Sequence, residues 1–490
     1  MNKYILKTIL CSALVAPALT SCELDQFPET SLPIEESWQT IKDATSYNTG
    51  LLAVLRGVSA GSIGVSEAQS DLFNLVNKGT AYNQVYSWKF TNTQFDGDGV
   101  WNGSYNLIAN ANNVITNIDK VDVKGNSQDS LLLREFKATA YFARAFAYAN
   151  MANHYCKNFD PATAENELGL PLCETVDVNA KPSRATLAQT YDLIKSDIAK
   201  AKEYFDNKED YDYSKPNYNT VLALEARVSL ETQDYDKAIE ASKTLIDAYP
   251  LYDDVNDFAY MWELDEGQEI IYQPIQTIEE RVGVYGMFIS YSPQLEMFDP
   301  QYLPTQGLLD LYEEDDYRKL IFFEQTGAAS GDIKDENAYI TRKFPGNESL
   351  KDQPTDFYNM IKVFRVAEFY LIAAEAQYRK DGNGLEYLNA LRAARGASEL
   401  KSTGVALLQD IKNEWAREMC GEGNRLDCLK RWNVGFKRMA PQPLTAGFFN
   451  DQEGFNDLEI KADNKKFVWE IPANDLQANK NLVRNWPVEK

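Results

Sequence analysis

Apolar residues recur with helical spacing along much of the chain. The clearest face belongs to a helix predicted to run from residue 101 to about residue 119, and its members are four, three and four residues apart: Trp101, Tyr105, Ile108 and Asn112. Residues on this spacing share one side of a helix, so we expect this side to pack inward. A second helix is predicted over 133–153, which lacks Gly and Pro and is rich in Ala, and a third over 186–205.

Two further pairs of helices resemble a degenerate repeat. Residues 220–250 match several positions of the tetratricopeptide repeat of about 34 residues, best at the offset from Ala238 to Pro250. Two serines stand where the repeat prefers Tyr and Phe, so the match is degenerate. A similar pair is predicted over 363–379 and 385–395. One helix pair cannot bury its own apolar face, so we expect the units to stack into a superhelical scaffold.

Long stretches without periodicity interrupt these helices, chiefly over 58–100 and 250–360. Loops of this length inside a compact fold usually carry function. The second stretch alternates aromatic residues with Gly, Pro, Asp and Ser, and includes a short strand predicted over Glu269–Gln273. The predicted fold class is therefore mainly α, a degenerate tetratricopeptide-type helical scaffold with long irregular, partly β insertions. Its helical body is expected over residues 36–57, 101–153, 184–248 and 363–432.

Composition and motifs exclude several classes of function. The 73 acidic residues exceed the 49 basic ones and give a formal charge of -24, so nucleic acid is a poor partner because its phosphates would be repelled. The single histidine, His154, rules out mechanisms that need several imidazoles, and we expect it to cap or pack a helix. No glycine-rich phosphate motif occurs, and no metal or other cofactor is predicted. The run Gln94–Gly99 is interpreted as a turn, because Val100 occupies an expected calcium-ligand position.

The first 21 residues are typical of an export signal. Lys3 and Lys7 precede an apolar run over 5–19 that is too short for a stable membrane span. The run ends in Leu19-Thr20-Ser21-Cys22, which is typical of a lipobox and predicts that Cys22 becomes the lipid-bearing first residue. Residues 1–21 are then a lipoprotein signal peptide, and 22–490 a single domain on a lipid tether. The alternative is ordinary secretion, with Cys22 as a structural thiol.

Four other cysteines would remain in the mature chain. An exported protein can oxidise them, and proximity along the sequence suggests the pairs Cys156 with Cys173 and Cys420 with Cys428, although three connectivities exist. Four buried free thiols are the alternative, because a chain of this length does not need disulfides to be stable.

Taken in order, these features resemble the SusD/RagB family of outer-membrane nutrient-binding lipoproteins. The resemblance covers essentially the whole chain and rests on short motifs: the lipobox at Cys22, Trp101-x3-Tyr105-x2-Ile108-x3-Asn112, Arg144-Ala145-Phe146, Arg184-Ala185-Thr186, Arg365-x2-Glu368-x2-Leu371-x3-Glu375-Ala376, Glu422-x2-Arg425-x-Asp427-x3-Arg431-Trp432 and Trp469-x-Ile471-Pro472. Each motif is weak, but their order over this length is specific. Taken by themselves, the charged residues are interpreted as pairs on a solvated or interhelical face.

The resemblance implies a cell-surface lipoprotein anchored in the outer membrane. Such a protein binds an oligosaccharide and passes it to a SusC-like TonB-dependent transporter, on which it sits as a lid. It would be a binding protein and not an enzyme. Capture of peptides by the same architecture is the alternative, and a non-catalytic scaffold is a further one.

In family members that bind glycans, ligand residues come from the loop before the Trp101 helix and from the aromatic-rich middle insertion. Aromatic rings stack on the C–H faces of a sugar, while Asn, Gln, Asp and Arg bind its hydroxyl groups. The candidates on this basis are Asn77, Tyr82 and Asn83 in the first loop and Tyr285, Phe288, Tyr291 and Tyr302 in the second. For each aromatic residue the alternative is packing in the core.

Overall fold

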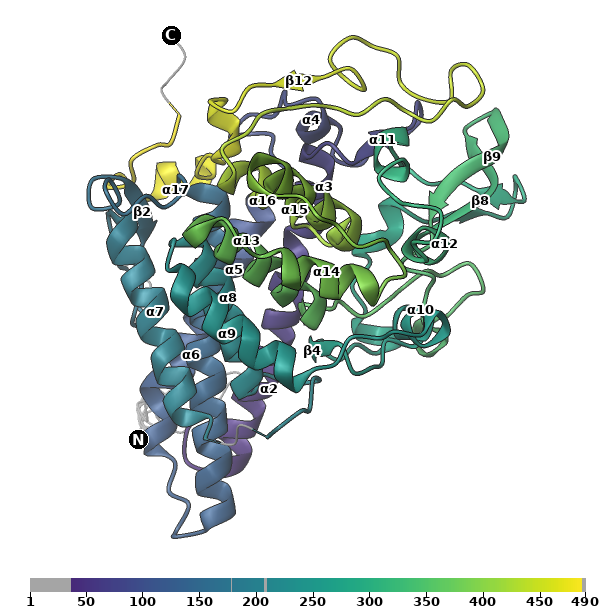
Figure 1. Ribbon diagram of the computed structural model, residues 1–490. Helices are drawn as coiled ribbons and strands as arrows, with labels where there is room; N and C mark the ends of the chain where they lie inside the picture. Colours follow the sequence, from purple (N-terminus) through teal and green to yellow (C-terminus); the bar gives the residue numbers. More distant parts are fainter. Residues whose placement is uncertain (1–36, 178, 207–208, 487–490) are drawn as a thin grey trace, which may run out of the picture.

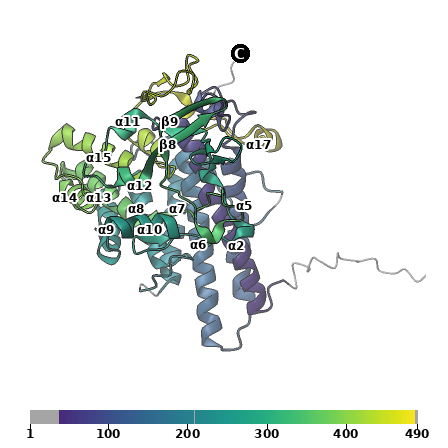
Figure 2. The same cartoon turned by 90° about the vertical axis from the view of Figure 1, so that its right-hand side faces the viewer.

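The computed structural model describes residues 37–177, 179–206 and 209–486. It has a body of packed helices, with short helices, strands and long loops on one side (Figure 1). Seen from that side, the elements of the middle insertion lie in front of the helices (Figure 2). This arrangement confirms the predicted fold class. The predicted signal peptide and Cys22 lie outside the described residues.

Four long helices form the elongated part of the body, at the lower left of Figure 1: α2 (Ile41–Gly61), α5 (Asp98–Asn117), α6 (Ser127–Tyr155) and α7 (Leu187–Tyr204). Side-chain caps determine where three of them begin. Thr40, Asn126 and Thr186 each accept a hydrogen bond from a backbone N–H in the first turn of α2, α6 and α7. The predicted inward face of α5 is confirmed, because Trp101 and Asn112 are buried.

Two helical hairpins continue the body: α8 (Tyr218–Glu231) with α9 (Tyr235–Ala248), and α13 (Val366–Asp381) with α14 (Leu385–Ala393). They correspond to the two repeat units predicted from the sequence. Helix α13 packs against α9 and against α15 (Gly404–Met419), which is followed by α16 (Arg425–Arg431). The hairpins therefore stack, as expected for units that cannot bury an apolar face alone.

The remaining elements are short. Before the middle insertion they are α3 (Ile63–Gln69), β1 (Phe73–Leu75), α4 (Asn83–Tyr86), η2 (Ile118–Lys120), β2 (Leu168–Pro171) and β3 (Arg184–Thr186). The insertion contains α10 (Val255–Leu264), β4 (Ile270–Tyr272), η3 (Ile278–Glu280), η4 (Val284–Met287), β5 (Tyr291–Ser292), β6 (Met297–Phe298), β7 (Tyr302–Pro304), α11 (Gln306–Leu309), α12 (Arg318–Phe322), β8 (Phe323–Ser330), β9 (Ile333–Thr341) and η5 (Glu348–Leu350). After it come β10 (Phe364–Arg365), β11 (Phe436–Lys437), β12 (Glu459–Ile460), η6 (Lys465–Phe467) and α17 (Ala473–Ala478). Strand β4 confirms the strand predicted over Glu269–Gln273.

The strands of the described residues form one four-stranded sheet and four two-stranded pairs. The order in the larger sheet is β5-β6-β8-β9, in which β6 and β8 are parallel and the other neighbours are antiparallel. The antiparallel pairs are β1 with β7, β2 with β3, β4 with β10, and β11 with β12. The first of these pairs joins the first loop to the middle insertion, so it determines where the predicted ligand residues lie.

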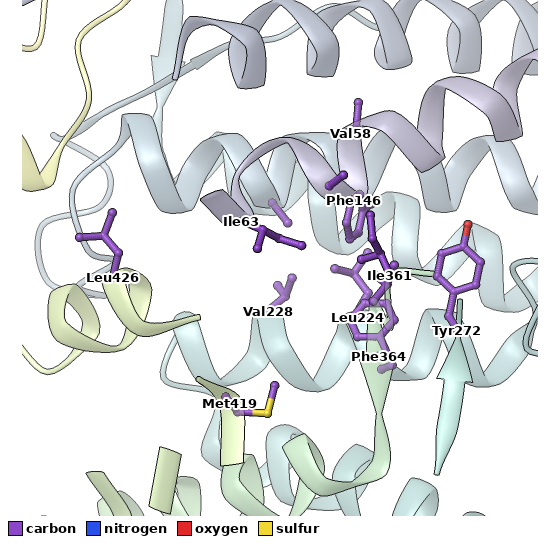
Figure 3. Packing of buried hydrophobic residues seen from close by; sticks show 14 of the residues in the cluster. Val58, Ile63, Phe146, Leu224, Val228, Tyr272, Ile361, Phe364, Met419 and Leu426 are labelled. Carbon is purple, nitrogen blue, oxygen red and sulfur yellow. The ribbon is translucent and has the colours of Figure 1, made fainter. Parts of the chain in front are cut away.

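Apolar side chains from distant parts of the chain converge in the core (Figure 3). Val58 from α2, Phe146 from α6 and Leu224 from α8 are buried, together with Ile361 and Met419 from the C-terminal half. All five line a small cavity of about 90 Å³ inside the body. The core therefore joins the two halves of the chain directly.

The charged motif residues Arg365, Glu368 and Glu375 are buried inside the protein and do not lie on a solvated face. Glu418 on α15 is 0% exposed and accepts hydrogen bonds from three arginines, Arg318, Arg365 and Arg395. Arg395 also donates to Glu269, which is itself buried. We call Glu418, Glu269 and the three arginines the buried ion network. Removing one partner from such a network costs about 3–5 kcal/mol, because the remaining charges stay desolvated.

The last described residues return to the N-terminal helices. The backbone N–H of Trp469 donates to the carbonyl oxygen of His154 at 2.8 Å. The guanidinium of Arg184 donates to the side-chain oxygen of Asn485 at 2.7 Å. We call residues 467–486 the C-terminal clasp, because they close the bundle formed by the beginning of the chain.

Of the two alternatives that the sequence left open, the structure has free thiols: the suggested pairs Cys156 with Cys173 and Cys420 with Cys428 are not formed. None of these four sulfur atoms is bonded to another cysteine. The Cys428 sulfur accepts a hydrogen bond from Arg431 at 3.4 Å. Three of the four thiols are buried and Cys173 is half-buried, so the alternative of free thiols holds with one of them partly accessible.

Candidate ligand-binding surface

The two loops that the sequence nominated for ligand binding meet in space. Strand β1 pairs with β7 in antiparallel register, with Leu75 opposite Tyr302. Just beyond this pair, the side-chain oxygen of Gln301 accepts hydrogen bonds from the backbone N–H groups of Thr80 and Ala81, at 2.9 and 2.7 Å. One glutamine therefore ties the first loop to the middle insertion. We call the joined segments, residues 76–84 and 287–302, the loop junction; it lies on the upper part of the molecule, near α4 and α11 (Figure 1).

A hairpin carries Tyr291 outward from the base of the loop junction. Backbone bonds from Gln301 to Met287 (3.0 Å) and from Asp299 to Ser290 (2.9 Å) form its lower rungs. Tyr291 then pairs with Phe298 in the ladder of β5 and β6, where the two rings meet edge to face with centroids 5.5 Å apart. Tyr291 is half-buried. Part of its side chain therefore remains accessible to a ligand.

Three predicted ligand residues lie in the core, which corrects their assignment to a solvent-facing platform. Phe288 and Tyr302 are 0% exposed, and Tyr285 is 3% exposed. Phe288 packs on Phe73 with ring centroids 4.6 Å apart, and the Tyr302 hydroxyl donates to the carbonyl of Ala81 at 2.7 Å. Tyr285 stacks on Phe344, with centroids 3.6 Å apart. These rings hold the loops together, and none can stack on a sugar without leaving the core.

The other first-loop candidates reach the surface. Asn77 is exposed in a turn closed by a hydrogen bond from the N–H of Gly79 to the carbonyl of Val76. Tyr82 and Asn83 are half-buried at the start of α4. Burial, with a smaller effect of the Asp96 carboxylate, raises the pKa of the Tyr82 phenol, so this hydroxyl stays protonated and can donate a hydrogen bond.

The Tyr82 ring lies directly over Gly64 of α3. A Cβ atom at Gly64 would lie 2.7 Å from the Tyr82 hydroxyl oxygen, closer than such atoms approach. Tyr82 itself has a φ of 55°, in the left-handed region. A glycine and an unusual backbone angle thus hold this ring in place, which is typical of a preorganised surface residue.

Sequence reasoning missed three residues of the loop junction and its rim. Gln301 joins the two loops, Lys78 is exposed beside the end of β8, and Asp96 is an exposed carboxylate close to Tyr82. Gln301 adjoins the nominated Tyr302, but no local pattern marks it, since its role depends on a loop more than 200 residues earlier. The junction and its rim carry amide, carboxylate and ammonium groups and two partly exposed rings, Tyr82 and Tyr291. Such a surface can bind hydroxyl groups and apolar sugar faces.

His154 is buried inside the protein, which confirms the expectation that it packs. Its Nε2 atom lies 3.1 Å from the Ser66 hydroxyl and 3.9 Å from a carboxylate oxygen of Asp427, while its Nδ1 atom lies 2.8 Å from the carbonyl of Asn150. In a catalytic triad the carboxylate binds the other nitrogen of the imidazole. Ser66 and His154 are both buried, and burial lowers the pKa of the imidazole. Within the described ranges, no group of three or more His, Cys, Asp or Glu side chains is placed to hold a metal ion.

Comparison with known proteins shows which family has this architecture. Residues 208–487 match the model of the SusD family, and residues 44–230 match a family described as starch-binding and associating with the outer membrane. A curated relative, the starch-binding protein SusD of Bacteroides thetaiotaomicron, is 30% identical over 127 residues, which are 26% of this chain and 21% of that protein. The match thus spans about a fifth of the relative's length.

Solved structures of other proteins share the fold of this chain over nearly its whole length. A SusD superfamily protein of Bacteroides vulgatus has a TM-score of 0.77 at 21% identity, covering 92% of this chain and 100% of that one. Surface glycan-binding protein A from Bacteroides uniformis has a TM-score of 0.71 at 18% identity, covering 91% and 99%. At these identities the likeness concerns the fold. Because the family model spans more than half of the sequence and the helical body and its insertions agree with it, the chain belongs to the SusD family.

Proposed function

We propose that this protein is an outer-membrane lipoprotein that binds a glycan at the cell surface and delivers it to a partner TonB-dependent transporter. The match of residues 44–230 to a starch-binding, outer-membrane-associated family carries this proposal, because that segment contains the first loop of the loop junction. Relatives whose names record starch or glycan binding support it. The transporter partner is inferred from the family alone.

The loop junction supplies the chemistry that glycan binding needs. Tyr82 and Tyr291 present partly exposed rings, on which the apolar face of a sugar can stack. Asn83 follows Tyr82 in the sequence and Asn77 precedes it in the same loop, and both amides can bind hydroxyl groups through donor and acceptor atoms. These four residues are the ligand contacts we propose at this site.

Binding without catalysis is part of the proposal. The histidine that any imidazole mechanism would require is buried with its nitrogens already bonded. Members of the family act by capture, and the loop junction gives this chain a surface suited to capture.

Calorimetry with a panel of neutral oligosaccharides tests the site. Tyr82→Ala and Tyr291→Ala should each weaken binding about five- to two-hundredfold with little change in melting temperature, because both rings are partly exposed. Leu131→Ala is the matched control, since Leu131 is 50% exposed at the far end of α6. Wild-type affinity in both tyrosine variants would exclude the loop junction. Binding of peptides but of no saccharide would favour the peptide-capturing alternative.

Anchoring is tested separately at Cys22, which lies outside the described residues. Cys22→Ala should release the protein from the membrane or leave an unprocessed precursor, while folding is unaffected. Membrane fractionation followed by mass measurement distinguishes these results. A variant that stays in the membrane fraction like the wild type would refute lipid anchoring.

A further inference from the structure

The most exposed aromatic side chains of the described residues lie together, away from the loop junction. Tyr211 is 50% exposed and Tyr260 is 53% exposed, and both line one open groove of about 600 Å³. The groove runs along α10, between the end of α9 and the segment that follows α7. Its aromatic lining consists of Tyr211, Tyr213, Tyr249, Tyr252 and Tyr260. We call it the tyrosine groove.

The tyrosine groove shares no element with the loop junction. In Figure 1, α10 lies at the lower right, whereas α4 and α11 lie at the top. A ligand bound along α10 would therefore be held independently of Tyr82 and Tyr291.

The inner wall of the groove is fixed by hydrogen bonds. Tyr249 is 4% exposed, and its hydroxyl accepts a hydrogen bond from Asn219 at 3.1 Å. The Tyr252 hydroxyl accepts one from the backbone N–H of Gln268 at 3.1 Å. At the adjacent Gly267 the φ is 149° and a Cβ atom would lie 2.4 Å from the Tyr252 hydroxyl, so only glycine allows this ring position. The wall is thus formed before any ligand arrives.

The outer rings have few restraints and face solvent. Tyr211 meets the buried Tyr249 edge to face, with centroids 5.6 Å apart and the planes at 65°. Tyr260 projects from α10 next to Leu264, which is 50% exposed. Leaving two phenol rings and a leucine in water at one groove is costly, and contiguous exposed apolar surface of this kind marks binding sites.

The rim of the groove defines the class of ligand. It carries Asp257, Glu266 and Gln268, and among the residues that the structure describes no Lys or Arg lines it. A phosphate, sulfate or carboxylate would therefore be repelled, whereas carboxylate and amide groups accept hydrogen bonds from hydroxyl groups. Flat apolar rings bordered by such acceptors suit a neutral pyranose. The volume lies within the range of small-ligand sites and suits a short stretch of sugar units.

We propose that the tyrosine groove is a second saccharide-binding site, specific for neutral glycans and separate from the loop junction. The proposal rests on the proposed function, because it takes the ligand of the groove to be part of the same glycan. Two sites on one chain raise the effective concentration of a polysaccharide at each of them. A long glycan would then be held more tightly than a fragment that fills one site.

The test uses the mature, full-length protein and Tyr211→Ala/Tyr260→Ala. The probes are maltohexaose, cellohexaose, xylohexaose and mannohexaose in calorimetry, and the matching polysaccharides in affinity electrophoresis. We expect the double variant to lose one of two binding events for a hexasaccharide and to bind the polysaccharide at least fivefold more weakly, with an unchanged melting temperature. Leu320→Ala, which removes an apolar side chain 77% exposed on α12, is the matched control and should bind like the wild type.

The outcomes separate the two proposals. If Tyr82→Ala/Tyr291→Ala abolishes all binding while Tyr211→Ala/Tyr260→Ala binds hexasaccharide and polysaccharide like the wild type, the groove is not a saccharide site and the proposed function stands. If the groove variant alone loses binding, the groove is confirmed. If the wild type binds none of the saccharides, both proposals are wrong.

Discussion

Glu67 and Glu414 are both fully buried glutamates, yet their surroundings move the pKa of their carboxyl groups in opposite directions. Burial raises the pKa of Glu67 from 4.5 to about 7, and one of its oxygens has no hydrogen-bond partner in the described structure. Burial also acts on Glu414, but Arg318, Arg417 and Arg392 outweigh it and lower that pKa to about 2. The first carboxyl therefore takes up a proton on folding near neutral pH, and the second releases one in acid.

The first prediction concerns Glu67→Gln. Because the folded pKa of Glu67 is raised, the ionised form opposes folding, and stability is lost as pH rises from 4.5 to about 7. The variant should therefore gain stability relative to the wild type across this window, on the order of 3 kcal/mol in total. Melting temperatures measured from pH 4 to 8 check this. A constant difference between the two proteins across that range would contradict it.

Glu414→Gln should behave in the opposite way, which makes it the second prediction. The folded pKa of Glu414 is lowered, so its contribution to stability is present above pH 4.5 and is lost as pH falls toward 2. We expect the variant to be destabilised by about 3–5 kcal/mol at neutral pH, because three arginines keep a desolvated charge. Denaturant unfolding at pH 7 and pH 3 should show a large difference at the first and a smaller one at the second. An equal loss at both pH values would refute the assignment.

The third prediction concerns the cysteines. Burial is the main reason that the pKa of Cys428 is raised to about 12, so this thiol is protonated and unreactive at neutral pH. In the native protein Cys173, which is half-buried, should react with a thiol reagent first, and the three buried thiols only after unfolding. A reductant should leave the melting temperature unchanged. A fall in melting temperature on reduction would mean that the thiols form disulfides, contrary to this prediction.

At the scale of elements, the turn between α13 and α14 contains two glycines. Each is required for a different structural reason. Gly382 has a φ of 84° and no atom within 4 Å of where a Cβ would be. Gly384 has a φ of 116°, and a Cβ there would lie 2.3 Å from the carbonyl oxygen of Ala374. The first needs only its backbone conformation, whereas the second also allows α14 to approach α13.

The fourth prediction compares alanine at these two positions. Gly382→Ala should cost about 1–2 kcal/mol from left-handed strain alone. Gly384→Ala should cost considerably more, because the helices must also move apart. Urea unfolding of both variants provides the comparison, with Gly382→Ala as the matched control. Equal losses would show that the two helices do not depend on this close approach.

The helices were predictable from the sequence because their signals are local. The face of Trp101 and Asn112 depends only on spacing within one helix, and it is buried as expected. The sequence also predicted where the long loops lie. It did not predict whether the aromatic side chains of these loops point into the core or toward solvent. Phe288 and Tyr302 are buried because strand β1 and Phe73, more than 200 residues earlier, pack against them. The same limit applies to the tyrosine groove, whose two exposed rings are brought together by the packing of separate segments.

For the whole molecule, the formal charge of -24 contrasts with the neutral ligand that we propose. Coulomb attraction contributes nothing to the binding of an uncharged sugar, so ionic strength should have little effect on its affinity. The fifth prediction is that affinity for a neutral hexasaccharide changes less than about twofold between 50 and 500 mM salt, since screening at these concentrations acts only on charged partners. Titration calorimetry at both concentrations measures this. A tenfold change would indicate a charged ligand.

The C-terminal clasp ties the folding of this chain to the order in which its residues are synthesised. Trp469 and Asn485 complete contacts of His154 and Arg184, so the N-terminal bundle lacks part of its surroundings until the last residues emerge. Contacts this distant along the sequence form late and slow the search for the native state. The N-terminal bundle can therefore reach its final packing only after nearly the whole chain has been synthesised. A chain that stalls before residue 469 lacks these contacts and is left open, and chains with such exposed apolar surface are prone to aggregate.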